Sequence, residues 1–183
     1  MSQERAGRAK TQLGLDVRTG TLLAQNFPDH VFDVVTMFHY FEHEIHPLPI
    51  LQEARRTLKE RGLLVVELPN VNSPLFRLFK SYWAPLDIPR HVVHYCANTL
   101  VAMLNRTGFD VVAVTYHPPT FMLASLLNFL GVVRFLLGLS LNAYLVALCL
   151  ALPFLPAELA CRLGFRLLRT GDTMTVCARP TGG

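Results

Sequence analysis

Two apolar stretches on either side of an amphipathic one constrain the fold of this chain more than any other feature. Residues 31–38 are rich in β-branched side chains and almost continuously apolar, which is typical of a central parallel strand covered on both faces. Residues 49–61 have the periodicity of an amphipathic helix that begins at Pro49 and ends at Gly62. Residues 63–68 follow at once as a second buried strand. This strand–helix–strand order predicts a parallel strand pair within an α/β domain.

The rest of the chain continues the alternation of helices and strands. The further elements that we expect are a helix over 2–12, strands over 15–18, 109–116 and 173–178, and an amphipathic helix over 97–106. Residues 71–95 are irregular, rich in aromatic residues and proline, and too long for a simple connection, so we expect them to carry or cover a site. The predicted fold is a mostly parallel sheet with helices on both faces.

The composition fits one domain with little solvating charge. The chain has 183 residues, the size of a single domain, and only 16% of them are charged, against about 25% in ordinary soluble domains. The net charge of +4 is modest, and we expect no nucleic-acid partner. The four cysteines form no C-x-x-C pair, and the first ten residues contain no apolar segment. Reduced thiols and a cytoplasmic location are therefore predicted.

An uncharged segment near the carboxyl end is the least typical part of the sequence. Between residues 118 and 157 the only charged residue is Arg134, which leaves uncharged stretches of 16 residues (118–133) and 23 residues (135–157). The longer stretch reaches the length that spans a bilayer, about 20 residues, but glycine, polar residues and prolines interrupt it. A single span would also put the last strand on the wrong side of the membrane. We predict attachment to a membrane surface; a soluble lid and a hairpin of two spans are the alternatives.

Three stretches together carry a family resemblance. Residues 32–43 read FDVVTMFHYFEH, a strand and the turn after it. Residues 51–70 run from a helix through a glycine and a strand to a proline-asparagine pair, and residues 86–95 contain a proline-arginine-histidine segment. In this order and spacing they resemble the class I S-adenosylmethionine-dependent methyltransferases, especially a broad bacterial branch of that family.

The resemblance implies a Rossmann-like α/β fold and a division of the chain into three parts. The implied parts are a partial methyltransferase core over 1–117, an apolar helical insertion over 118–170, and the last strand of the core with its tail over 171–183. The glycine-rich cofactor loop of the family and its acidic ribose-binding residue do not occur before this core. We therefore expect a domain that is truncated at its amino terminus and binds the cofactor weakly.

The cofactor that the resemblance implies is S-adenosylmethionine. Ligands of open parallel sheets lie beyond the carboxyl ends of the strands. The candidate cofactor-binding residues at those positions are Gly20, Thr21, Leu22, Phe38 and His39. By resemblance, Thr21 and Leu22 lie near the adenine, whereas Phe38 and His39 lie near the sulfonium. The alternative is that Leu22 and Phe38 are ordinary core residues.

Residues that could act on the methyl acceptor cluster in the irregular stretch. The candidate catalytic residues, each able to take a proton from a hydroxyl or an amine, are Asp87, His91 and His94. The candidate substrate-binding residues, which offer stacking surfaces and an anion-binding guanidinium, are Tyr82, Trp83 and Arg90. The alternative is structural: Arg90 pairs with Asp87, and the histidines bond to neighbouring backbone.

Residues 39–43 also spell H-x-x-E-H, the inverted zinc-protease signature. Such a site needs both histidines on a stable helix. Here the first histidine follows a strand, and Pro47 and Pro49 interrupt any long helix soon afterwards. We therefore predict no metal.

The function that these features predict is transfer of a methyl group from S-adenosylmethionine to a small or lipid-linked acceptor, at the inner face of the membrane. One alternative is a non-catalytic methyltransferase relic that serves membrane or partner binding, which the missing glycine-rich loop favours. A nicotinamide-dependent enzyme is a further alternative, but the sequence lacks its fingerprint. The acceptor atom and the oligomeric state stay open.

Overall fold

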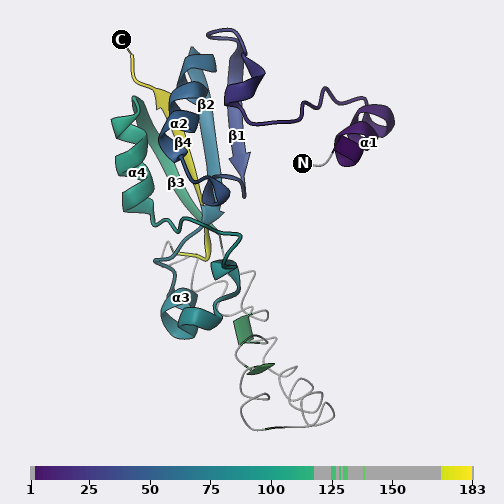
Figure 1. Ribbon diagram of the computed structural model, residues 1–183. Coiled ribbons are helices and arrows are strands. Elements are labelled where there is room, and N and C mark those ends of the chain that lie inside the picture. The colour runs from purple at the N-terminus through teal and green to yellow at the C-terminus, as the bar shows by residue number, and fades with distance from the viewer. Residues whose placement is uncertain are drawn as a thin grey trace.

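A four-stranded sheet with helices packed against one face forms the body of the computed structural model (Figure 1). The structure describes residues 3–117, 125–126, 128, 130–131, 138 and 170–182. The helices are α1 (Gln3–Leu13), α2 (Pro47–Thr57), α3 (Pro74–Phe79) and α4 (Ala97–Arg106). The strands are β1 (Phe32–Phe38), β2 (Leu58–Pro69), β3 (Phe109–His117) and β4 (Thr173–Pro180). Short 3₁₀ helices within the connections are η1 (Leu23–Gln25), η2 (Phe41–His43), η3 (Lys80–Tyr82) and η4 (Ala84–Leu86).

The strands lie in the order β1-β2-β4-β3. β1 and β2 are parallel, with Val35 opposite Leu64, whereas β4 is antiparallel to both of its neighbours, β2 and β3. Consequently β1, β2 and β3 run in one direction and only β4 is reversed. The predicted α/β fold is confirmed, and the last two strands, β3 and β4, pair within one sheet.

The end of α2 differs from the prediction. The helix ends at Thr57, whose hydroxyl donates to the carbonyl oxygens of Glu53 and Ala54, and Leu58 is already extended and paired with β1. Gly62, expected to end the helix, instead lies within β2, where the register with β1 shifts. A Cβ atom there would lie 2.8 Å from the Leu58 side chain and 2.9 Å from the Lys59 carbonyl oxygen. The glycine therefore serves a close approach in a strand irregularity.

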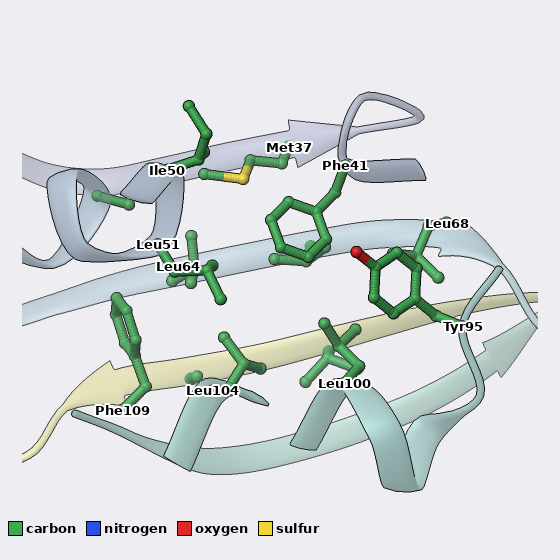
Figure 2. Packing of buried hydrophobic residues seen from close by; sticks show 14 of the residues in the cluster. Met37, Phe41, Ile50, Leu51, Leu64, Leu68, Tyr95, Leu100, Leu104 and Phe109 are labelled. Atoms are coloured by element: carbon green, nitrogen blue, oxygen red, sulfur yellow. The ribbon is translucent and has the colours of Figure 1, made fainter. Parts of the chain in front are cut away.

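The hydrophobic core lies between the sheet and two helices, α2 and α4 (Figure 2). Alternate residues of β2 and β4 point into it, since side chains of a strand alternate between the two faces. The fully buried apolar residues of the sheet and these two helices are Ile50, Leu51, Ala54, Leu58, Leu64, Val66, Leu68, Leu100, Leu104, Phe109, Met174, Val176 and Ala178. Phe41 and Tyr95 close one end of the core, with ring centroids 5.4 Å apart.

Two expectations about the amino-terminal strands are wrong. Residues 15–18 form no strand, and their backbone N–H groups make only nearby bonds among the described residues, from Leu15 to Ala9 and from Val17 to Leu15. β1, expected at the centre of a sheet, lies at an edge, and β2 is its only strand partner within the described part of the chain. Val34 is 51% exposed and Phe38 56%, so β1 is not covered on both faces.

Helices on both sheet faces were also expected, but the described ones that pack on the sheet lie on one face. α2 and α4 contribute to a single core, whereas α1 stands apart from the sheet (Figure 1). The opposite face carries Glu67 of β2 and Thr175 of β4, which are linked by a hydrogen bond.

Most residues of the predicted apolar insertion lie outside the described residues, so its helices and the division of the chain at 118 and 170 remain predictions. Within the described part of the chain, no helix is both long and apolar enough to cross a membrane. The strands that flank the insertion lie side by side, because His117 and Thr173 are partners in the β3–β4 ladder.

Leu104→Ala should lower the free energy of unfolding by about 2–5 kcal/mol, because it leaves a cavity in the core where the native side chain is fully buried. Chemical denaturation followed by circular dichroism measures this change. The matched control is Leu78→Ala, which removes a leucine side chain that is 70% exposed and should change stability by no more than about 0.5 kcal/mol. Equal effects of the two substitutions would contradict the assignment of the core.

Candidate functional site

The polypeptide turns sharply where β1 ends. His39, the residue after the strand, has a left-handed backbone (φ 47°), and its N–H donates to the Glu67 carbonyl oxygen at 2.9 Å. Its ring lies between two carboxylates: Nδ1 is 3.3 Å from Glu42 Oε1, and Nε2 is 3.6 Å from Glu67 Oε1. The turn therefore holds an imidazole at the carboxyl end of β1, where ligands of open α/β sheets lie.

Glu42 is a buried carboxylate at the centre of this region. Its side chain is only 2% exposed. Oε1 lies 3.8 Å from His91 Nε2 as well as near His39, whereas Oε2 has no hydrogen-bond partner among the described residues. The Glu42 backbone carbonyl accepts bonds from the N–H groups of Val92 and Val93. Glu42 thus connects the end of β1 to the segment that holds the candidate acceptor residues.

Backbone carbonyl groups orient the histidines of that segment. Nδ1 of His91 lies 2.7 Å from the Pro85 carbonyl oxygen, and Nε2 of His94 lies 2.9 Å from that of Leu86. A carbonyl oxygen only accepts, so these ring nitrogens carry the proton. In the neutral ring the lone pair is therefore on the remaining nitrogen of His91, Nε2, which lies 3.8 Å from Glu42 Oε1.

Asp87 and Arg90 form an ion pair, which was the structural alternative to a catalytic role for these residues. Arg90 donates to Asp87 Oδ1 at 2.7 Å and 3.2 Å, and the Asp87 carbonyl accepts from the N–H groups of Arg90 and His91. His91 Nε2 is 4.0 Å from Asp87 Oδ2. The pair thus caps the turn before His91, and the exposed Arg90 guanidinium lies at the surface beside it.

Trp83 has a packing role. Its side chain is 1% exposed, its ring meets Phe76 edge-on at 5.4 Å, and its indole N–H donates to Asp172 Oδ1 at 3.3 Å. The expectation that it offers a stacking surface to an acceptor is therefore corrected, because the ring is covered by the protein. Tyr82 is half-buried next to it, and its carbonyl oxygen faces the Asn128 amide at 3.4 Å.

A second polar network crosses the open face of the sheet. The Thr175 hydroxyl donates to Glu67 Oε2 at 2.7 Å and lies 2.6 Å from His117 Nε2, which also approaches Glu67 at 3.4 Å. Because the threonine proton is used toward Glu67, His117 Nε2 is the donor to the hydroxyl. The Glu67 carboxylate therefore links β1, β2, β3 and β4 through His39, Thr175 and His117.

The five candidate cofactor residues fall into two places. Gly20, Thr21 and Leu22 line a cavity of about 360 Å³ that also includes Phe32, the first residue of β1. Phe38 and His39 are not among the residues that line it, and Phe38 lies six residues farther along the strand, roughly 20 Å away. The structure therefore does not bring the five residues together: Phe38 and His39 are exposed at the carboxyl end of β1, whereas the cavity lined by residues 20–22 lies near its amino end.

Sequence reasoning did not assign Glu42, His43 and Glu67 to the site. The first two did carry a signal, since both belong to the H-x-x-E-H pattern. The structure does not support the helix that the pattern requires, because His39 ends a strand and residues 41–43 form only a short 3₁₀ helix. Glu67 carried no signal, because a charged residue in a strand normally faces solvent.

The comparisons with known proteins agree with this architecture. Residues 3–114 match the family model described as a methyltransferase domain. A SAM-dependent methyltransferase from Thermotoga maritima has a TM-score of 0.59 and 17% identity over 97% of this chain and 70% of its own. One from Archaeoglobus fulgidus has a TM-score of 0.52 and 18% identity over 89% of this chain and 66% of its own. No curated protein matches the sequence.

The fold also occurs in a protein that is named for another reaction. The [4+2]-cyclase SpnF superposes with a TM-score of 0.52 and 17% identity, over 100% of this chain and 65% of SpnF. This chain therefore spans 65% to 70% of the length of the three structures described. These structural similarities establish the fold, but they do not identify the reaction that this chain catalyses.

The family-model match covers more than half of the chain, and the chain therefore belongs to the methyltransferase-domain family. This confirms the resemblance found in the sequence and the class of enzyme that it implies. S-adenosylmethionine is the methyl donor of that class.

Asp172→Asn should stabilise the protein at pH 7. Burial raises the pKa of Asp172 above its ordinary value, so the unfolded chain releases this proton more readily than the folded one. The free-energy cost of burying the ionised carboxylate is full above the raised pKa. It disappears as the pH falls below about 4, the ordinary pKa of an aspartate. The gain from the neutral amide should therefore shrink between pH 7 and pH 4.

Urea unfolding at several pH values, followed by the fluorescence of Trp83, the only tryptophan, measures this dependence. Asp110→Asn, which alters an exposed carboxylate, is the control and should change stability much less. A loss of stability at pH 7 that stays constant down to pH 4 would contradict the role assigned to burial.

Proposed function

We propose that this protein transfers a methyl group from S-adenosylmethionine to a small or lipid-linked acceptor bound between the end of β1 and residues 82–95. The observation that carries the proposal is the buried Glu42 carboxylate, which lies between His39 on one side and His91 on the other. This arrangement joins the predicted cofactor position to the predicted acceptor position within a few ångströms.

On the cofactor side, Phe38 and His39 are the described residues that would hold S-adenosylmethionine, which supplies an activated methyl group when bound. Phe38 presents an exposed ring at the end of β1, and His39 is fixed by its backbone bond to Glu67. Methyl transfer from a sulfonium is an in-line displacement, so the protein mainly aligns the reacting atoms and excludes water. A rigid turn beside a buried charge suits that task.

On the acceptor side, His91 is the residue best placed to act on the acceptor's proton. Its Nδ1–H is held by the Pro85 carbonyl, and its Nε2 lone pair faces Glu42 and Asp87. Asp87 is occupied by Arg90, and the Nε2 of His94 is occupied by a carbonyl oxygen. Both histidines thus have one ring nitrogen at a carbonyl oxygen, and His91 is the one whose other ring nitrogen lies beside Glu42, in a side chain that is only 11% exposed.

His91→Ala should lower turnover at least about 100-fold and leave the affinity for S-adenosylmethionine nearly unchanged, as expected when one proton-handling group is lost. The measurements are radiolabelled methyl transfer to a panel of hydroxyl, amine and lipid-linked acceptors, and calorimetric titration with S-adenosylmethionine. His46→Ala, an exposed histidine three residues beyond His43, should change neither value. An equal loss of turnover and affinity in His91→Ala would assign the segment to structure instead.

We further propose that residues 118–170 attach the enzyme to a membrane surface without crossing it. The uncharged stretches over 118–133 and 135–157 provide the apolar area. Arg162, Arg166 and Arg169, spaced by four and three residues, suit anionic headgroups. The pairing of β3 with β4 supports an attachment that does not cross the membrane, because the chain returns to the sheet that it left.

Vesicle flotation tests the attachment. Each arginine near anionic lipid adds roughly 1 kcal/mol, so binding should be strong on phosphatidylserine vesicles at low salt and should decline as salt is raised. Replacing all three arginines with glutamine should weaken binding to anionic vesicles and leave any binding to neutral ones unchanged. Binding that ignores both lipid charge and salt, or no binding at all, would contradict the proposal.

A further inference from the structure

Three side chains from two separate segments converge beside the end of β1. Candidate ligand atoms of Glu42, His43 and His91 all lie within 4.8 Å of one another. The His43 and His91 rings meet edge-on, with centroids 4.8 Å apart. We propose that these three residues bind a divalent transition-metal ion of the Zn²⁺ type, which is the ion class that histidine and carboxylate ligands suit.

The hydrogen bonds of both histidines favour this role. Nδ1 of His43 lies 2.7 Å from the Arg90 carbonyl oxygen, and Nδ1 of His91 lies 2.7 Å from the Pro85 carbonyl oxygen. Carbonyl oxygens only accept, so both Nδ1 atoms carry protons, and in the neutral rings that bind metals both Nε2 atoms offer lone pairs. Histidines that bind metals characteristically donate their other ring N–H to a carbonyl or carboxylate in this way.

Glu42 supplies a second and independent observation. Its side chain is 2% exposed, and Oε2 has no hydrogen-bond partner among the described residues. A buried carboxylate oxygen without a partner costs free energy, and a cation removes that cost. The contacts of Oε1 with His39 and His91, at 3.3 Å and 3.8 Å, leave Oε2 available as the ligand.

The backbone already holds the two segments together. Val92 and Val93 donate to the Glu42 carbonyl oxygen, and His43 is fixed through its ring to Arg90. Ligand atoms on a tetrahedral zinc ion lie roughly 3.4 Å apart, given bonds of about 2.0–2.1 Å. Side-chain movements on the order of 1 Å would therefore bring the three ligand atoms to the distances that a bound zinc ion needs.

The proposed site differs from the zinc-protease reading of the same pattern. In that signature both histidines of H-x-x-E-H are ligands on a helix, whereas here His39 faces Glu42 and Glu67 and is replaced in the group by His91. The third ligand thus comes from a segment 48 residues farther along the sequence than His43.

Three protein ligands leave at least one coordination position open, as in catalytic metal sites. An acceptor hydroxyl bound there would ionise more easily, because a divalent cation lowers the pKa of a bound oxygen. This use of the ion rests on the proposed function: with the ion bound, His91 Nε2 is a ligand and no longer a base, and the proton of the acceptor hydroxyl passes to the solvent. Binding of the ion itself does not depend on methyl transfer.

Calorimetric titration of the metal-free full chain with Zn²⁺ alone tests the site. We expect one equivalent to bind, with affinity at least tenfold lower in Glu42→Gln, His43→Ala and His91→Ala. His46→Ala is the matched control, and it should bind as the wild type does. Circular dichroism and Trp83 fluorescence verify that each variant is folded. For any variant that does not fold, the conservative His43→Gln or His91→Gln takes its place.

The absorption spectrum of the Co²⁺ form separates these ligands from the cysteines. Nitrogen and oxygen ligands predict visible d–d bands without thiolate-to-cobalt charge transfer in the near ultraviolet. Absence of binding, a thiolate band, or equal weakening by His46→Ala would overturn the site. If the chain binds Zn²⁺ but transfers no methyl group, the metal site is supported and the proposed function is rejected. If the chain transfers methyl groups, does not bind Zn²⁺ and is unaffected by a chelator, the proposed function is supported and the metal site is rejected.

Discussion

The insertion of β4 between β2 and β3 is the interaction on which the rest of this structure depends. β4 pairs with β2 over Leu64–Pro69 and with β3 along its whole length, and it buries Met174, Val176 and Ala178 completely. Without it, β3 would have no strand partner among the described residues. The residues just before β4 also fix the end of β2, because Asn70 donates to the carbonyl oxygens of Gly171 and Asp172. A reversed strand from the end of the chain thus positions the carboxyl edge where the candidate site lies.

Elements whose signal is local could be predicted from the sequence. α4 lies at residues 97–106, as its amphipathic pattern predicted, and β3 extends one residue beyond its predicted end. The strand expected over 15–18 failed because a strand also needs a neighbour, and β1 pairs with β2 alone. For the same reason, the position of β1 at an edge could not be predicted. Its apolar residues indicate burial, but they do not indicate which strands lie beside it. Gly62 was misassigned because a glycine at a strand irregularity and one after a helix look alike in sequence.

The candidate site could be predicted in part, for related reasons. Residues 82–94 were recognised as a cluster, and the structure indeed holds Asp87, Arg90 and His91 together. The burial of Trp83 could not be seen, because its partner Asp172 is 89 residues away. The buried charge of Glu42 was equally hidden, since a glutamate in a turn normally faces water. Only the fold reveals that the bonds from Val92 and Val93 carry a histidine onto this carboxylate.

The meeting of β3 and β4 has a practical consequence for dissecting this protein. His117 and Thr173 are direct partners in an antiparallel ladder, and a Cβ atom on Gly171 would collide with the His117 carbonyl oxygen. Two strands that end opposite each other need only a two-residue turn to join them, and shortening a loop lowers the entropy lost on closing it. A minimal protein in which Asn-Gly replaces residues 118–170 joins the strands through a four-residue loop that includes Gly171 and Asp172, and it keeps the strand register. It would separate the chemistry of the sheet edge from whatever the apolar segment contributes.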